Sequence, residues 1–392
     1  MNRKVNVLGV GMVKFQKPGA SDGYEVMANG AIKEALKDAG IDWKFVEQAY
    51  AGYVYGDSTC GQRAVYSIAP TGIPVINVNN NCSTGSTALW LARQAVEGGM
   101  AECVLAVGFE QMQKGALQTL WQDRTNPLDQ HVNVMNDQQG FNSAPPAAQM
   151  FGGAGREYRW RHGTRRETFA KISEKARKHA SKNPFALFRE VLSVEQILAS
   201  DEVFDPLTRF QCCPPTCGAA AAILCSEEFA KKHNLKPAVR IAGQTMKTDF
   251  PSSFGQSMIQ MVGFDMAKSA ANELYEKTGI GPKDVQVVEL HDCFTANELL
   301  TYEAIGLCPE GGAEKFITEN DNTYGGKFVV NPSGGLLSKG HPLGATGLAQ
   351  CTELVWHLRG TAGDRQVDGA KHALQHNLGL GGACVMTMYA KS

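Results

Sequence analysis

Residues 82–89 read CSTGSTAL and residues 341–348 read HPLGATGL, and these two stretches decide the fold. Their offset of 341 − 82 = 259 aligns Gly85 with Gly344 and Thr87 with Thr346. Each stretch follows a polar turn and opens an apolar run, which predicts a helix start at both places. One copy carries Cys82 and the other carries His341 at the same position.

A second pair of segments repeats in the same order. Residues 34–46 read EALKDAGIDWKFV and residues 273–285 read ELYEKTGIGPKDV, each predicting a helix that ends at Gly, then a short turn and a strand. Chance similarity of helix starts could explain either pair alone. Because both pairs keep their order and helix-like segments alternate with strand-like ones, we predict two duplicated α/β halves.

The segment from 114 to 202 has no counterpart in the second half. It is polar and irregular before it becomes partly helical, so we expect an inserted loop or lid subdomain there. The predicted domains are an N-terminal half made of residues 1–113 and 203–240, the insertion 114–202, and a C-terminal half, 241–392.

Composition excludes several classes of protein. The chain has 392 residues with 38 Lys and Arg against 39 Asp and Glu, which gives no electrostatic bias toward nucleic acid or an anionic membrane. Eleven cysteines, an odd number in a long chain, argue against a disulfide scaffold. Cys212, Cys213 and Cys217 cluster without a CxxC pair, so no metal site is expected.

Targeting signals point to no special compartment. No signal peptide precedes the first strand-like run, and no apolar stretch reaches the ~18–20 residues of a membrane helix. The last residues, Ala390-Lys391-Ser392, are not the Ser-Lys-Leu peroxisomal address. We expect a cytoplasmic protein; a peroxisomal location would need another signal or a longer tail.

The insertion contains a basic stretch. From Arg156 to Arg189 there are seven Arg and four Lys against three Glu, a balance of 11 − 3 = +8. One interpretation is a docking surface for the phosphates of a large anionic cofactor. A solvated helix face explains the same charges equally well, and the sequence leaves both open.

Cys82 is the first candidate for chemistry. A helix N-terminus lowers the pKa of a thiol from its usual ~8.5, and the small residues after Cys82 let a substrate approach. The alternative is a free cysteine in a buried turn. His341 lies in the turn Ser338–Gly344 and could take the proton of Cys82 or donate a hydrogen bond to an oxyanion, unless it is structural.

Two further segments carry reactive groups. His291 and Cys293 follow the strand-like run VQVVEL, where catalytic residues of α/β sheets often lie, although a plain strand end would look the same. The segment 377–383, NLGLGGA, lets the main chain approach a reacting group and aim N–H groups at it. It lacks the spacing of a dinucleotide-binding fingerprint.

Together these motifs resemble the thiolase superfamily, in particular its sterol-carrier-protein type. The resemblance covers nearly the whole chain, and it implies the thiolase fold, an α/β fold of two duplicated halves in five αβαβα layers with an inserted loop subdomain. It rests on GVGMVKF (9–15), GYVYGDSTCGQRA (52–64), NVNNNCSTGSTAL (77–89), ECVLAVGFE (102–110), ELHDCFTANELLTYEAIGLCPEG (289–311), NPSGGLLSKGHPLGATGLAQ (331–350) and LQHNLGLGGA (374–383).

The resemblance also implies roles for individual residues. Cys82 resembles the acyl-accepting nucleophile, and His341 resembles the histidine that activates it and stabilises the enolate. His291 stands where ordinary thiolases hold a water with Asn, and Cys293 resembles the acid/base cysteine of this branch. The backbone N–H groups of Cys82 and Gly381 resemble a second oxyanion hole.

Some positions depart from the family pattern. Cys217 stands where relatives usually have Asp, and Gly379 occupies the place of the second catalytic cysteine of ordinary thiolases. Cys384 aligns with no catalytic cysteine, so we expect it to be structural. The chain ends before any sterol-carrier lipid-binding domain, which makes lipid transfer doubtful.

The implied activity is CoA-dependent cleavage of 3-oxoacyl-CoA, as in fatty acid β-oxidation, or the reverse condensation. Coenzyme A is then a co-substrate with no permanently bound cofactor, and the protein is a homodimer or a dimer of dimers. Two alternatives remain: a retro-aldol lyase of the lipid-transfer-protein type, and a non-catalytic module that binds acyl-CoA or sterol.

Overall fold

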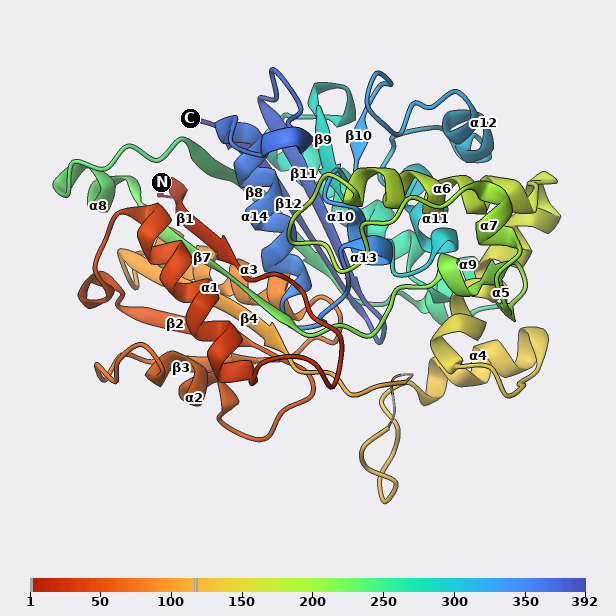
Figure 1. Ribbon diagram of the computed structural model, residues 1–392, viewed down its shortest axis with the longest axis horizontal. Helices are drawn as coiled ribbons and strands as arrows, with labels where there is room; N and C mark the ends of the chain where they lie inside the picture. The colour runs from red at the N-terminus through yellow and green to blue at the C-terminus, as the bar shows by residue number, and fades with distance from the viewer. Residues whose placement is uncertain (1–2, 116, 118) are drawn as a thin grey trace.

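The computed structural model describes residues 3–115, 117 and 119–392. Two halves of the chain build one ten-stranded sheet (Figure 1). The first half supplies β1 (Val5–Met12), α1 (Tyr24–Ala39), β2 (Gln48–Gly52), α2 (Cys60–Tyr66), β3 (Val75–Val78), α3 (Thr84–Glu97), β4 (Cys103–Glu110) and β7 (Gly218–Ser226). The second supplies β8 (Val239–Lys247), α10 (Phe264–Thr278), β9 (Val287–Glu289), α11 (Thr295–Ala304), β10 (Val329–Val330), α14 (Thr346–Arg359), β11 (His372–Gly379) and β12 (Ala383–Lys391).

The strand order demonstrates the duplication. The first half has the order β3-β2-β4-β7-β1 and the second has β10-β9-β11-β12-β8, each with three parallel strands followed by two antiparallel ones. The halves join where β1 pairs with β8 at only two positions, Asn6 with Arg240 and Val7 with Val239. The internal repeat predicted from the sequence therefore corresponds to a repeated order and direction of strands in the two halves.

Helices complete five layers. α3 and α14 pack against each other and against strands of both halves, so they form the middle layer (Figure 1). α1 and α2 cover the outer face of the first half, and α10 and α11 lie outside the second half. The predicted arrangement of two duplicated halves in αβαβα layers is confirmed.

The two middle helices begin in very close contact. A Cβ atom added to Gly85 would lie 2.7 Å from the carbonyl oxygen of Gly344, and one added to Gly108 of β4 would lie 2.1 Å from that oxygen. Gly347 is equally confined, with Ser86 Oγ at 2.1 Å from its added Cβ. These glycines let the two helix starts, and the residues just before them, meet.

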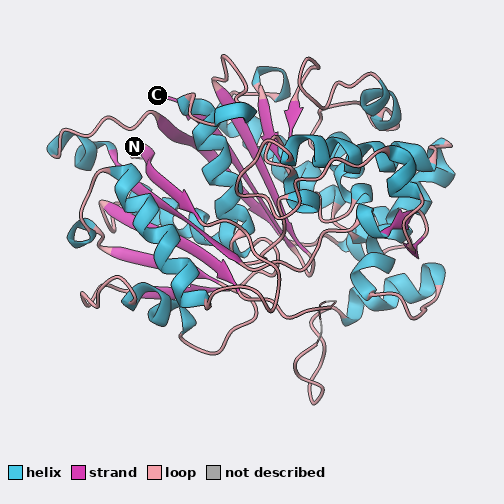
Figure 2. Ribbon diagram, in the orientation of Figure 1, coloured by secondary structure: helices cyan, strands magenta, loops and turns pink. Residues whose placement is uncertain are grey.

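The insertion lies in the connection from β4 to β7. In the second half, only residues 380–382 separate the equivalent strands β11 and β12. The connection between β4 and β7 holds α4 (Asp129–Gln139), α5 (Pro146–His162), α6 (Arg166–Ala180), α7 (Val194–Leu198), β5 (Glu202–Phe204) and β6 (Leu207–Thr208), so β5 and β6 lie at or beyond the predicted end of the insertion. α5 and α6 pack on α11, so the helical mass lies beside the second half (Figure 2). The exact domain boundaries given above stay predictions.

Shorter helices fill the remaining connections. They are α8 (Glu227–Lys232), α9 (Met258–Met261), α12 (Ala313–Thr318) and α13 (Gly335–Ser338). Within the described residues, no helix is long and apolar enough to cross a membrane.

The helix contact at Gly85 leads to a stability prediction. Gly85→Ala is expected to destabilise the protein by about 1–3 kcal/mol, because its methyl group would meet backbone atoms that cannot rotate away. Gly30→Ala in α1 is the matched control, since its added Cβ meets only the Val13 side chain, at 3.0 Å. Urea unfolding measures both, and equal midpoints for the two variants would contradict the close-contact argument.

Candidate active site

Cys82, His291 and His341 converge at one buried point. The sulfur and one nitrogen of each imidazole all lie within 4.8 Å of one another, and the two rings meet edge-on with centroids 5.0 Å apart. Cys82 immediately precedes the N-cap of α3, His291 follows β9, and His341 lies between α13 and α14. Three of the four side chains singled out from the sequence thus meet at this point, one from the first half and two from the second, and the fourth, Cys293, lies near them.

Hydrogen bonds fix the tautomer of His341. The Thr346 hydroxyl lies 3.0 Å from the Pro342 carbonyl oxygen and 2.7 Å from His341 Nδ1. When it donates to the carbonyl it accepts from His341 Nδ1, and in this arrangement Nδ1 carries the imidazole proton. Among the residues that the structure describes, none hydrogen-bonds its buried Nε2, and burial lowers the pKa of His341 to about 3. His341 consequently presents an unprotonated nitrogen, which is what a general base requires.

His291 has the opposite tautomer. Asn377 Nδ2 donates to the Cys82 carbonyl at 3.1 Å and lies 3.0 Å from His291 Nδ1, which must then be an acceptor. The amide orientation is set from behind, because Ser86 Oγ donates to Asn377 Oδ1 and Gln375 donates to Ser86. Burial, with smaller effects from His341 and His376, holds the pKa of His291 well below its usual value. Neutral His291 therefore carries its proton on Nε2.

The two histidines thus offer different chemistry. His341 can accept a proton, whereas His291 can donate a hydrogen bond to a developing negative charge. A thiol with two imidazoles is also a ligand set that zinc accepts. Here the proton on His291 Nε2 opposes metal binding, because its other nitrogen already accepts from Asn377. The arrangement suits acyl chemistry better than a metal centre.

The pKa of Cys82 differs from the prediction. The sequence predicts that the helix N-terminus lowers the pKa of this thiol. Burial instead raises the pKa of Cys82 to about 12, and the Glu110 carboxylate adds to the shift, while the N–H groups of Cys82 and Leu380 oppose it. The desolvation of a thiolate in this site outweighs the helix start. Cys82 is a neutral thiol at rest, and its activation depends on a base.

Cys293 and a second thiol, Cys213, lie beside Cys82. Cys293 is buried between β9 and α11, and burial raises its pKa well above the usual value, with further contributions from Cys213 and Cys82. Burial also raises the pKa of Cys213 well above its usual value, with further contributions from Cys82 and Cys212. Sequence reasoning found Cys293 but dismissed Cys213, because its neighbours carry no recognisable motif.

The segment around Cys213 passes directly over the site. Cys212 forms an antiparallel bridge with Phe294, and Pro215 forms a parallel bridge with His341. Thr216 Oγ1 accepts the His341 backbone N–H at 3.1 Å. The segment 212–217 therefore holds the His341 turn against the strand end that carries Cys293.

Two buried carboxylates, also missed from the sequence, support the site. Glu110 at the end of β4 accepts N–H bonds from Val54, Tyr55 and Gly344, and burial raises its pKa to about 7. Asp292 accepts from Leu336 and Leu337 at 2.7 and 3.3 Å, and burial raises its pKa to about 8. Both carboxylates tie the loop that carries His341 to strand ends.

The glycine-rich segment closes the other side of Cys82. Asn81 Nδ2 donates to the Leu380 carbonyl at 2.9 Å, which fixes the turn between β11 and β12 next to the nucleophile. Gly381 is solvent-exposed with φ of +92°, a conformation that glycine adopts without strain. Its role with the Cys82 N–H as an oxyanion hole stays a prediction. Cys384, expected to be structural, is fully buried.

The basic stretch Arg156–Arg189 is largely neutralised within the molecule. Lys175 is buried against Glu298, and several partners lie outside the stretch. The cations that pair with carboxylates are Arg159, Arg161, Arg165, Arg166, Lys175 and Lys178. The balance of +8 counted from the sequence thus overstates the available positive charge. These contacts favour the structural interpretation, and a role in binding CoA phosphates stays a prediction.

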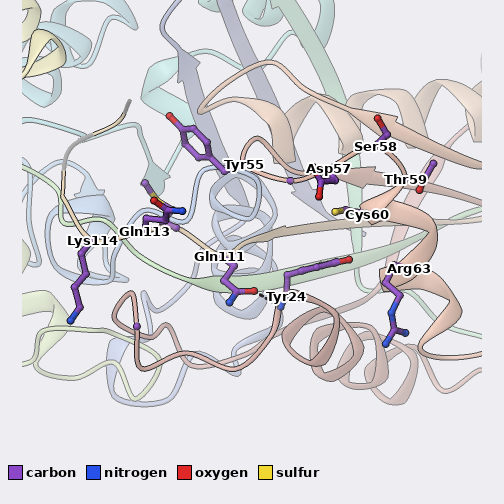
Figure 3. A pocket seen from close by; sticks show the side chains of 13 residues that line it. Tyr24, Tyr55, Asp57, Ser58, Thr59, Cys60, Arg63, Gln111, Gln113 and Lys114 are labelled. Carbon is purple, nitrogen blue, oxygen red and sulfur yellow. Dashed lines mark hydrogen bonds between the residues drawn. The ribbon is translucent and has the colours of Figure 1, made fainter. Parts of the chain in front are cut away.

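A cavity of about 790 Å³ adjoins the site (Figure 3). Its wall includes Tyr55, Gln111 and Lys114, but none of Cys82, His291, Cys293 and His341. Tyr55 links the two places, because burial and then the charge of Cys82 raise the pKa of Tyr55 to about 12. The cavity is therefore a neighbour of the reaction centre and not the centre itself.

Comparison with known proteins identifies relatives along the whole chain. A family model described as "Thiolase, N-terminal domain" matches residues 8–228, and one described as "Thiolase C-terminal domain-like" matches residues 252–389. Sterol carrier protein 2 of Oryctolagus cuniculus is 61% identical over 391 residues, which cover 98% of this chain and 72% of the rabbit protein.

Solved structures share the fold at lower identity. The Ltp2-ChsH2(DUF35) aldolase superimposes with a TM-score of 0.84 at 22% identity, covering 99% of this chain and 98% of that one. Human mitochondrial 3-ketoacyl-CoA thiolase gives 0.76 at 20% identity, covering 100% and 99%.

The raised pKa of Cys82 predicts the pH dependence of its alkylation. Because the pKa lies near 12, the thiolate fraction in the resting protein should rise about tenfold per pH unit from pH 6 to 9 without levelling off. Iodoacetamide labelling of the Cys82 peptide, followed by mass spectrometry, measures this. Free glutathione in the same tube is the control and should level off near pH 9. A plateau for Cys82 below pH 7 would show an activated resting thiolate instead.

The tautomer of His291 predicts a gain of metal affinity. Asn377→Asp replaces the donor with an acceptor, so His291 should move its proton to Nδ1 and free Nε2 for coordination. We expect the variant to bind Zn²⁺ at least ~10-fold more tightly than the unaltered protein, measured by competition with a chromophoric chelator. Adding Cys82→Ala should remove the gain. If the gain survives that change, the metal is bound elsewhere.

Proposed function

Because the chain belongs to the thiolase family, we propose that it cleaves 3-oxoacyl-CoA with coenzyme A, or runs the reverse Claisen condensation, through an acyl-Cys82 intermediate. The observation that carries the proposal is the meeting of Cys82 with two neutral histidines of opposite tautomer. One histidine can take the thiol proton, and the other can donate to an oxyanion. The activity is that of an acetyl-CoA C-acyltransferase.

Acylation is the first half of the reaction. His341 Nε2 takes the proton of Cys82 as the sulfur attacks the 3-keto carbon, so the thiolate forms only when the substrate is present. The oxygen of that carbon becomes negative, and the N–H groups of Cys82 and Gly381 donate to it. One oxyanion donor of this kind is commonly worth about 3 kcal/mol.

Carbon–carbon cleavage follows. The C2–C3 bond breaks, and its electron pair forms the enolate of acetyl-CoA or propionyl-CoA. Protonated His341 and the Nε2–H of His291 donate to the enolate oxygen, and Cys293 gives its proton to C2. The high pKa of Cys293 suits a thiol that stays protonated until a strongly basic carbon appears.

Coenzyme A completes the cycle. Its thiol gives a proton to the Cys293 thiolate, and its sulfur attacks the acyl-Cys82 thioester. The products are the shortened acyl-CoA and the free Cys82 thiol, which regains its proton from His341. Coenzyme A is thus a co-substrate, and the cycle needs no permanently bound cofactor.

A retro-aldol lyase is the second candidate. It is favoured by the fold shared with the Ltp2-ChsH2(DUF35) aldolase. Such a reaction forms no acyl-cysteine and leaves Cys82 without a task. A third candidate, a module that only binds acyl-CoA or sterol, needs neither Cys82 nor Cys293. The unprotonated His341 beside Cys82 therefore favours thiolysis over the lyase and over the binding module.

We also propose that the protein is a homodimer or a dimer of dimers that serves fatty acid β-oxidation. In the described part of the chain, β3 is an edge strand of the ten-stranded sheet. A second copy pairing along that edge would cover its free backbone groups.

Removing the nucleophile tests the proposed activity. Cys82→Ala should lower CoA-dependent cleavage of acetoacetyl-CoA by about 10³-fold or more while CoA still binds, because acyl transfer has no other acceptor. Cleavage is followed by loss of the enolate absorbance and CoA binding by calorimetry. Cys308→Ala, a partly exposed cysteine of the second half, is the matched control and should keep full activity.

Each candidate gives a different result in this assay. Wild-type cleavage by Cys82→Ala would refute thiolysis. A 3-hydroxyacyl-CoA offered without CoA tests the lyase, and its cleavage to a ketone or aldehyde would favour that candidate. Binding of acyl-CoA without turnover by the unaltered protein would favour the binding module.

A further inference from the structure

Cys213 and Cys293 face each other across an antiparallel contact. The N–H of Cys213 donates to the carbonyl of Cys293 at 2.9 Å, and the neighbouring residues Cys212 and Phe294 form the bridge that defines the register. Residues opposed in this way project their side chains on the same side. The two thiols are therefore brought together by the backbone and not by chance side-chain orientation.

The spacing of such a pair suits a disulfide. Hydrogen-bonded opposed residues in antiparallel strands have Cα atoms about 5.5 Å apart. Disulfides join Cα atoms about 4.4–6.8 Å apart and Cβ atoms about 3.5–4.5 Å apart, so the Cα spacing fits and the two Cβ atoms must move slightly closer for the bond to form. Cys82 is also near, but it belongs to the start of α3 and lies among the two histidines.

The two residues differ in position. Cys213 is partly exposed in the segment that covers the site, whereas Cys293 is only 4% exposed, and both sulfur atoms are buried. Because the segment that carries Cys213 reaches the surface, an oxidant that enters there meets Cys213 first, and Cys293 is placed to resolve the product. Burial raises the pKa of both thiols, so their oxidation should be slow near neutral pH and faster in mild alkali.

We propose that Cys213 and Cys293 form a reversible disulfide with each other. Low-molecular-weight disulfides such as oxidised glutathione serve as the oxidant. The Cys213 thiolate attacks one sulfur of the glutathione disulfide and releases one glutathione thiolate. The Cys293 thiolate then attacks the Cys213 sulfur and releases the second. The two protons lost by the cysteines end on the two glutathione thiols, so one disulfide is reduced and one is formed.

The consequence for catalysis rests on the proposed function. Once bonded to Cys213, Cys293 cannot protonate the enolate at C2, so thiolytic cleavage stops. In the proposed cycle Cys293 also exchanges its proton with the coenzyme A thiol, so the disulfide slows acyl transfer as well. Cys82 and His341 are themselves untouched, so the disulfide switches off cleavage and leaves the nucleophile unmodified.

The test follows the bond and the activity separately. The protein is incubated with oxidised glutathione at pH 8.5, and non-reduced peptides are analysed by mass spectrometry. We expect a peptide linking Cys213 to Cys293, and a loss of cleavage activity of about 10-fold or more that dithiothreitol reverses. Alkylation of Cys82 by iodoacetamide should persist in the oxidised protein, because the nucleophile is not part of the disulfide.

Single substitutions provide the controls. Cys213→Ser should remove the linked peptide and keep its activity in oxidised glutathione, whereas Cys212→Ser, next to it in sequence, should behave like the unaltered protein. Melting temperatures verify that both variants are folded. A link from Cys82 to either cysteine, or only glutathione adducts, would overturn the proposal. If the reduced protein shows no cleavage, the peptide link still decides the disulfide, and only the proposed function fails.

Discussion

The contact between the starts of α3 and α14 is the constraint on which the rest of the molecule depends. The Gly344 carbonyl oxygen lies only 2.7 and 2.1 Å from where Cβ atoms of Gly85 and Gly108 would be, so any side chain there would push the two halves apart. The residues just before these helices are Cys82 and the His341 turn. Their separation is therefore set by backbone contact in the middle layer, and a reaction centre forms where two copies of one motif meet.

The two halves keep the same hydrogen bond at the start of α3 and α14 but use it for different purposes. Thr87 and Thr346 occupy equivalent places, and each hydroxyl donates to a backbone carbonyl four residues before it, Ser83 or Pro342. In the first half the hydroxyl then accepts from Asn80, whereas in the second it accepts from His341 Nδ1. The same local bond thus supports a turn in one copy and selects the tautomer of a base in the other.

Much of this could be predicted from the sequence, because the repeat and the placement of Cys82, His291 and His341 depend on local patterns. The glycine spacing and polar turns identified the helix starts and hence the residues beside them. Other features depend on partners far along the chain. The pKa of Cys82 follows from burial and Glu110, and the charge of the basic stretch is reduced by Glu298 and Glu314 in the second half. Cys213 lies near the site because its neighbour Cys212 forms a β-bridge with Phe294, and no sequence motif encodes that bridge.

The high pKa values of the thiols restrict their reactivity to the moment when a substrate is bound. A resting thiolate at Cys82 would react with any electrophile that entered, whereas a neutral thiol beside an unprotonated His341 becomes nucleophilic only when an attacked carbonyl can receive charge. The network from Gln375 through Ser86 and Asn377 keeps His291 as a donor at that same moment. Because that network also binds the Cys82 carbonyl, the position of the nucleophile and the protonation of its neighbour are held by one side chain, Asn377.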